Sequence, residues 1–96
     1  MEPIRFASQI RYWNPEWSSG LSVADIPVAD VKAFGGLKQQ RVRGTLDGIT
    51  FSSNVMPAGG GRLALSVSKA MMTATRVGIG DEAAFEITSI GRDEPT

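Results

Sequence analysis

The sequence predicts a small all-β domain, and three observations carry this prediction. Apolar and polar residues alternate in short runs that Gly, Pro and Asn separate, with little recurrence at helical spacing. The chain has 96 residues, enough for one modest core but not for two. Because many short strands in an open sheet would leave exposed edges, we expect residues 1–96 to form one closed six-stranded β-barrel with two short helices.

The first two strands are expected to form a hairpin. From Ile4 to Tyr12, Ile4, Phe6, Ser8 and Ile10 alternate with polar residues or alanine, which is typical of a half-buried strand. The Asn14-Pro15 step interrupts it, because Pro cannot donate to a ladder. A second strand is then predicted over Trp17–Val23.

A short helix is predicted from Ile26 to Phe34. Pro27 is preorganised for the first helical turn, and apolar residues recur three apart at 28, 31 and 34. Gly35 and Gly36 are expected to end this helix.

A hairpin over residues 41–54 has the clearest local signal. Asp47-Gly48 suits a type I′ turn, and alternating strands flank it on both sides. The stretch Met56–Gly61 is expected to be irregular, since three consecutive Gly residues lose much backbone entropy on ordering. Strand alternation resumes over Arg62–Val67.

The last third of the chain predicts a helix and a strand. Ser68 is the expected N-cap of a helix from Lys69 to about Arg76, and Gly78 is expected to stop it. Gly80-Asp81 then turns the chain into a final strand that alternates from Glu82 to Ser89. Residues 91–96 are predicted to be a polar tail.

Composition excludes several kinds of chemistry. Without His or Cys, the chain has no disulfide, thiolate nucleophile, Ser-His-Asp triad or zinc finger. We expect no cofactor, metal or catalytic residue, because Asp47, Asp81 and Glu82 already have roles at turns. No run of ~20 apolar residues predicts a membrane span, and the N-terminus lacks a signal-peptide pattern. We therefore expect a cytoplasmic protein with no membrane partner.

Several short motifs together resemble a known family. They are the run Arg41–Phe51, the Met56-Pro57 step, the Gly59–Arg62 loop, the Leu65–Lys69 junction and the closing Gly78–Asp81. In this order they resemble the bacterial and archaeal domain-of-unknown-function family DUF1905. The resemblance implies a double-split β-barrel and brings no biochemical activity. Larger members of that family carry a YdeI/OmpD-associated, bacteriocin-protection-like domain after it.

A second likeness concerns the segment from Leu65 to Ile87. It is similar to the half-unit of AbrB/MazE-like transcription regulators, which bind DNA as dimers through basic side chains. The ten basic and ten acidic residues of this chain give a net charge of zero, whereas such modules are basic on one face. Shared barrel geometry is the alternative explanation.

The Gly-rich loop and its neighbours are candidate ligand-binding residues. Backbone N–H groups of a Gly-rich loop can form an anion cradle, but the spacing matches neither a P-loop nor a dinucleotide site. The alternatives are a plain connection between strands and polar residues that satisfy strand-end backbone groups. The candidate set is Ser52, Ser53, Asn54, Gly59, Gly60, Gly61, Arg62 and Lys69.

Two aromatic residues complete the candidate ligand site. Trp13 and Trp17 could stack on a planar molecule, and the alternative is that they plug one end of the barrel. For nucleic acid the candidates are Lys38, Arg41, Arg43 and Arg62, against a plain solvated face.

The sequence favours a non-enzymatic module that binds a small molecule or a peptide. A nucleic-acid-binding or toxin-antitoxin-like regulator is the first alternative, and an accessory subunit of a bacteriocin-protection-like system is the second. We also expect a homodimer, because a small split barrel leaves edge surface that a second copy can cover, with a monomer as the alternative.

Overall fold

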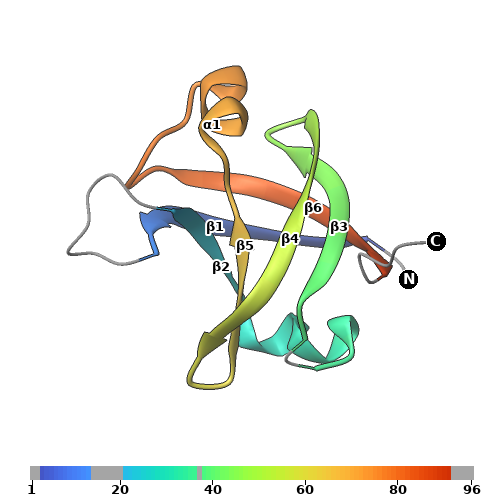
Figure 1. Cartoon of the computed structure of the whole chain (residues 1–96). Helices are drawn as coiled ribbons and strands as arrows, with labels where there is room; N and C mark the ends of the chain where they lie inside the picture. Colours follow the sequence, from blue (N-terminus) through green and yellow to red (C-terminus); the bar gives the residue numbers. More distant parts are fainter. Residues whose placement is uncertain (1–2, 14–20, 37, 92–96) are drawn as a thin grey trace.

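The computed structural model describes residues 3–13, 21–36 and 38–91. Within these ranges six strands close into an antiparallel barrel in the order β1-β2-β5-β4-β3-β6 (Figure 1). The strands are β1 (Ile4–Tyr12), β2 (Ser22–Ile26), β3 (Gln40–Leu46), β4 (Ile49–Gly59), β5 (Arg62–Ser66) and β6 (Glu82–Gly91). The predicted mainly-β barrel with two helices is confirmed.

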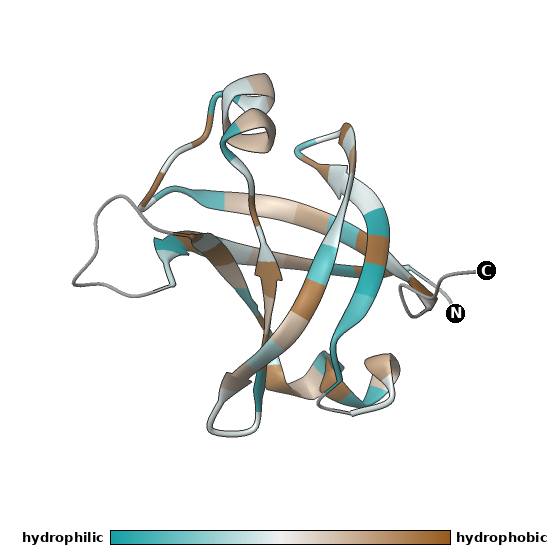
Figure 2. Ribbon diagram, in the orientation of Figure 1, coloured by the Kyte–Doolittle hydropathy of each residue, from teal (hydrophilic) through white to brown (hydrophobic). Residues whose placement is uncertain are grey.

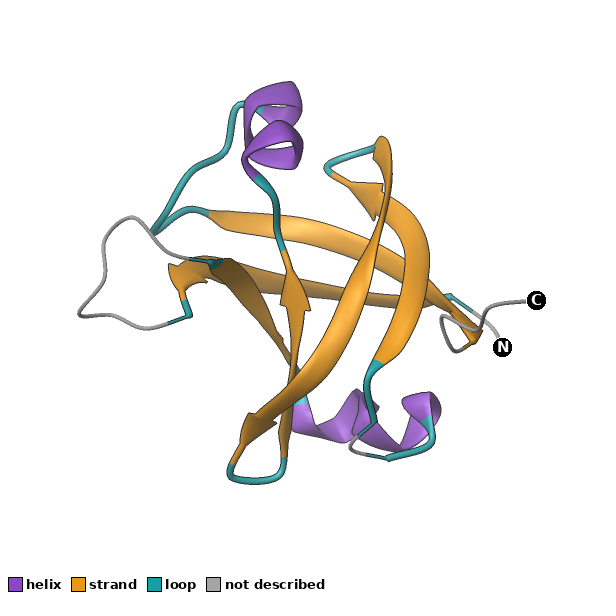
Figure 3. Ribbon diagram, in the orientation of Figure 1, coloured by secondary structure: helices purple, strands orange, loops and turns teal. Residues whose placement is uncertain are grey.

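The two short helices lie at opposite ends of the barrel (Figure 3). One is the 3₁₀ helix η1 (Val28–Phe34), and the other is α1 (Lys69–Thr75). The three-residue spacing that predicted a helix fits η1, because a 3₁₀ helix has three residues per turn. Phe34 is its buried residue, whereas Val28 is 66% exposed.

Side chains from every strand fill the interior. Figure 2 shows hydrophobic residues interspersed with hydrophilic ones along the strands, and the buried apolar side chains form one cluster. Its largest fully buried members are Phe85, Ile10, Ile26, Leu46, Leu63, Leu65 and Ile87. Among the described residues, Ser22 and Gln40 are the buried polar ones. The Gln40 amide accepts from the Ser89 hydroxyl at 2.7 Å and donates to the Phe34 carbonyl. This amide therefore ties η1 to β3 and β6.

The second strand lies later in the chain than the sequence predicted. β2 spans Ser22–Ile26, whereas the prediction was Trp17–Val23 and placed Ile26 in the helix. Pairing decides its position, because Ile10–Tyr12 of β1 and Leu63–Ser66 of β5 align with residues 22–26. The hairpin pairing of β1 with β2 is confirmed, and residues 17–20 lie outside the described part of the chain.

The prediction of an irregular stretch at Met56–Gly61 was wrong. β4 continues to Gly59, and the tight turn to β5 uses positive φ angles of 83°, 61° and 77° at Gly59, Gly60 and Gly61. Pro57 is tolerated because β3 pairs with β4 only as far as Val55, so β4 has one neighbour beyond that point. The ladder also shifts register between Pro57 and Gly59.

Local signals at two other places are confirmed. Asp47 and Gly48 have φ angles of 48° and 87°, as a type I′ turn requires. The Ser68 hydroxyl caps α1 by accepting from the Met71 N–H at 3.1 Å. However, α1 ends at Thr75 because Arg76 takes a left-handed conformation (φ 59°), one turn before Gly78 could stop it.

At Gly44 the backbone of β6 occupies the space that a side chain of β3 would need. An ideal Cβ built at this position would lie 1.8 Å from the Glu86 carbonyl oxygen. No side chain fits there without separating the two backbones. A glycine is therefore required for β3 and β6 to pair at this register.

Gly44→Ala is expected to destabilise the barrel by about 2–4 kcal/mol, because β3 must move away from β6 to admit the methyl group. Chemical denaturation followed by Trp fluorescence would measure the loss. Gly78→Ala is the matched control, since its Cβ would meet only Asp81 Oδ2 at 3.9 Å. Equal stability of the two variants would contradict this account.

Candidate functional site

The candidate ligand residues that the structure describes are spread over several parts of the barrel. Gly59–Gly61 form the turn at one end of β5, and Lys69 begins α1 beyond its other end (Figure 1). Ser52, Ser53 and Asn54 lie in the middle of β4. Gly59 lies five positions after Asn54 along the strand, a distance of about 17 Å.

The Gly-rich loop has a conformational role. All three glycines have positive φ, and they join β4 directly to β5. Arg62 follows the turn. Its positive charge helps to lower the pKa of Asp25, the acidic partner of an ion pair described below.

Ser53 satisfies a backbone group, as one of the alternatives predicted. Its hydroxyl donates to the Ser66 carbonyl at 2.6 Å, just beyond the point where the β4–β5 ladder begins at Val55 and Leu65. The side chain thus extends the bonding between these two strands.

Trp13 lies just after β1 and is partly exposed. Its exposed fraction is 37%, and its backbone N–H donates to the Leu21 carbonyl at 2.6 Å. Trp17 lies outside the described residues, so its predicted role stays a prediction.

Two polar rows cross the outer face of the barrel. In the first row Arg43 of β3 lies opposite Ser52 of β4 and Thr88 of β6. The buried residues Val42 and Leu46 show which face of β3 points inward, so Arg43 points outward. Paired side chains on one face of a sheet lie about 5 Å apart at Cβ, so Arg43 stands between two hydroxyls.

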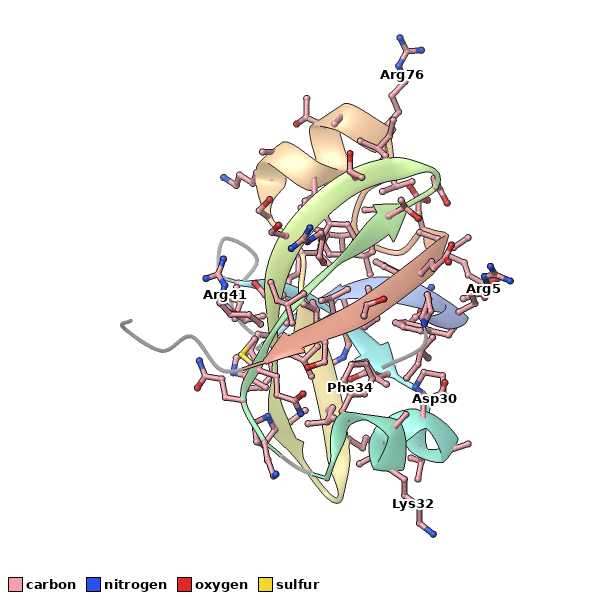
Figure 4. The ribbon with its side chains drawn as sticks, turned by 90° about the vertical axis from the view of Figure 1, so that its right-hand side faces the viewer. Arg5, Asp30, Lys32, Phe34, Arg41 and Arg76 are labelled. Carbon is pink, nitrogen blue, oxygen red and sulfur yellow. The ribbon has the colours of Figure 1, made fainter. Side chains whose placement is uncertain are left out.

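The second row lies next to the first. Thr45 of β3 pairs with Thr50 of β4 and Glu86 of β6, and Glu86 pairs in turn with Arg5 of β1. Arg5 and Glu86 form an exposed ion pair, with Arg5 Nη2 3.4 Å from Glu86 Oε1. Figure 4 shows Arg5 and Arg41 extending from opposite sides of the barrel.

A groove of about 420 Å³ follows these rows along β3 and β6. Arg43 is exposed, and in the part of the chain that the structure describes it forms no ion pair with an acidic residue. The groove therefore combines a cation, several hydroxyls and an apolar residue at one end. Its lining includes Arg43, Thr45, Thr50, Glu86, Thr88 and Ile90.

The nucleic-acid candidates are only partly brought together. Arg41 lies one row beyond Arg43 and pairs with Asn54, so both arginines share the outer face of β3 with Ser52 and Asn54. Lys38 precedes β3, and Arg62 lies at the far end of the β4–β5 hairpin.

Arg11 and Asp25 form a second ion pair, across β1 and β2. Arg11 Nε lies 2.8 Å from Asp25 Oδ2 and Nη2 lies 2.9 Å from Oδ1, a bidentate geometry. This hydrogen bonding lowers the pKa of Asp25 against the opposing effect of burial, and it raises the pKa of Arg11. The side chains are 39% and 31% exposed, so solvent screens the attraction.

Sequence reasoning missed the residues that β6 contributes. Thr88 and Glu86 reach the groove through pairing with residues more than forty positions earlier, and no local pattern reports such a register. The sequence did indicate one residue of the groove, because strand alternation assigns Arg43 to the outer face.

These features define a small closed antiparallel barrel with a polar groove on its outer wall. The family model for "Domain of unknown function (DUF1905)" matches residues 6–87, and the chain belongs to this family. None of the curated proteins matches the sequence significantly. Neither helix within the described ranges is long and apolar enough to cross a membrane.

Asp25→Asn is expected to make stability less sensitive to acid. Because folding lowers the pKa of Asp25, the contribution of the ion pair is complete above the ordinary pKa of 3.8 and is lost as pH falls through the lower folded-state value. At neutral pH the variant should lose less than about 1 kcal/mol, since the pair is partly exposed.

Thermal unfolding of both proteins between about pH 2 and pH 7 measures this difference. The wild type should lose more of its thermal stability below about pH 4 than the variant does. Parallel curves for the two proteins would show that the ion pair has no such role.

Proposed function

We propose that this domain is a non-enzymatic binding module that holds a small anionic molecule in the groove on β3 and β6. The observation that carries the proposal is Arg43, an exposed cation between the hydroxyl-bearing Ser52 and Thr88 on neighbouring strands. A guanidinium presents a planar fork of donors that matches a carboxylate or a phosphate.

Most of the remaining lining suits the same class of ligand, and the carboxylate among it, Glu86, is already paired with Arg5. Thr45 and Thr50 add hydroxyls that can donate to anionic oxygens, and Ile90, 44% exposed, offers apolar contact to a short carbon skeleton. A volume of about 420 Å³ suits a small metabolite. The buried core leaves the wall of the barrel, and not its interior, as the place for a ligand.

Arg43→Gln should weaken binding of such an anion by about tenfold or more, because it removes a hydrogen-bonded charge. We would titrate ¹⁵N-labelled protein with small mono- and dicarboxylates and sugar phosphates and follow the amide signals of Gly44, Thr45 and Thr88. Lys32→Gln, which removes an exposed cation from η1, is the matched control and should bind as the wild type does.

An unchanged affinity in Arg43→Gln, or shifts confined to another part of the barrel, would contradict the proposal. The nucleic-acid alternative is supported by Arg41 and Arg43 on one face with Ser52 and Asn54. It predicts a gel shift with genomic fragments that weakens steeply as salt increases, since phosphate contacts release counterions.

A further inference from the structure

The first half of β1 has one strand neighbour in the described part of the chain. Ile4–Gln9 pair with Ile87–Glu82 of β6, whereas β2 pairs with β1 only at Ile10–Tyr12. The other edge of residues 4–8 is therefore uncovered by any described strand. In Figure 1 the ribbon of β2 turns away from β1 toward η1.

The hydrogen bonds of β6 show in which direction the backbone N–H and C=O groups of β1 point. The Ala84 carbonyl accepts from the Asp47 N–H at 2.9 Å, and the Ala84 N–H donates to Asp47 Oδ1 at 2.9 Å. Both backbone groups of Ala84 thus face away from β1. Because opposite residues in an antiparallel ladder exchange both hydrogen bonds or neither, those of Ala7 face the uncovered edge. The two-residue period places those of Arg5 there as well.

We propose that a second copy of this chain pairs with this edge, so that the two β1 strands lie antiparallel with Phe6 at the two-fold axis. The length of the uncovered stretch sets this register. Pro3 has no N–H to donate at one end, and β2 approaches at the other, which leaves Ile4–Ser8 with Phe6 at its centre. The inference does not depend on the proposed anion site.

In this register the backbone groups are matched. Arg5 of one copy lies opposite Ala7 of the other, and the two residues exchange both hydrogen bonds, twice in the dimer. Phe6 lies opposite its symmetry mate in the closer, non-hydrogen-bonded position. Phe6 and Ile4 are only half-buried in the single chain, so pairing removes apolar surface from water.

The outer face of the same edge is complementary in shape and charge. Ala7 pairs with Ala84, and these two small residues lie in a hollow of about 520 Å³ beside the edge. Glu82 and Glu86 flank Ala84 at the alternate positions of β6, on the same face. Arg5 of the second copy lies opposite Ala7, so its long side chain extends over this hollow between two carboxylates. The hollow itself is lined by Glu86 and by Arg5 of the same chain, so the incoming Arg5 joins an existing ion pair, with Glu82 as its second acidic neighbour. The two-fold axis repeats the contact.

The mass in solution tests the dimer. Light scattering or sedimentation at about 100 μM should give about twice the chain mass of 10.2 kDa. A mass of 10.2 kDa at that concentration would overturn the proposal.

Ala7→Lys tests the edge and its register. It fills the hollow and places a cation opposite Arg5 of the second copy, so the Kd of the dimer should rise about tenfold or more. Ala33→Lys, the same change at an exposed position of η1, is the matched control and should leave the Kd unchanged. A dimer whose Kd is the same in Ala7→Lys and the wild type would overturn the assignment to β1.

Amide hydrogen exchange tests the same interface in the wild-type protein, so the result does not depend on whether the Ala7→Lys variant folds. The Arg5 and Ala7 amides, which the β1–β6 ladder does not use, should become protected as protein concentration rises. Amides of residues 38–46 should not change. Exchange of Arg5 and Ala7 that stays fast in a dimeric sample would rule out this interface.

Discussion

The barrel depends on β6, which pairs with β1 on one side and with β3 on the other. Both pairings are long-range. Among the described residues β1 and β6 are the first and last strands, and Arg43 of β3 pairs with Thr88 of β6, 45 positions later. The contact with β3 has a steric condition at Gly44, where the Glu86 carbonyl occupies the space of a side chain. This close contact fixes the register between β3 and β6. The register in turn places Thr88 beside Arg43 and Glu86 beside Thr45 in the two outer polar rows.

The closely packed interior explains why the polar side chains that could bind a ligand lie on the outer face of the barrel. Thirteen buried apolar residues form the core cluster, and the buried amide of Gln40 is hydrogen-bonded to Phe34 and Ser89. A ligand site inside the described barrel would have to displace this core. On the outer face, short strands and small residues such as Ala84 and the threonines leave shallow hollows that a second molecule can fill.

Features with a local physical cause could be predicted from the sequence. The Asp47-Gly48 turn needs positive φ at both positions, and the Ser68 cap needs only a hydroxyl before a helix. The position of β2 and the continuation of β4 through Pro57 depend on the partner strand, which alternation alone does not identify. Alternation could assign Arg43 to the outward face. It could not identify Thr88 as the neighbour of Arg43, because Thr88 lies on the partner strand.

The double pairing of β1 also has a consequence for the order of events in folding. Ile10–Tyr12 find β2 soon after they are made, but Ile4–Gln9 must wait for residues 82–87. Contacts this far apart in sequence make folding slow compared with helical proteins of similar size. During synthesis, at about 5–20 residues per second, the start of β1 remains unpaired for several seconds. Pro3 then acts before the native state exists, because a residue without an N–H limits how far nascent chains can associate through this strand.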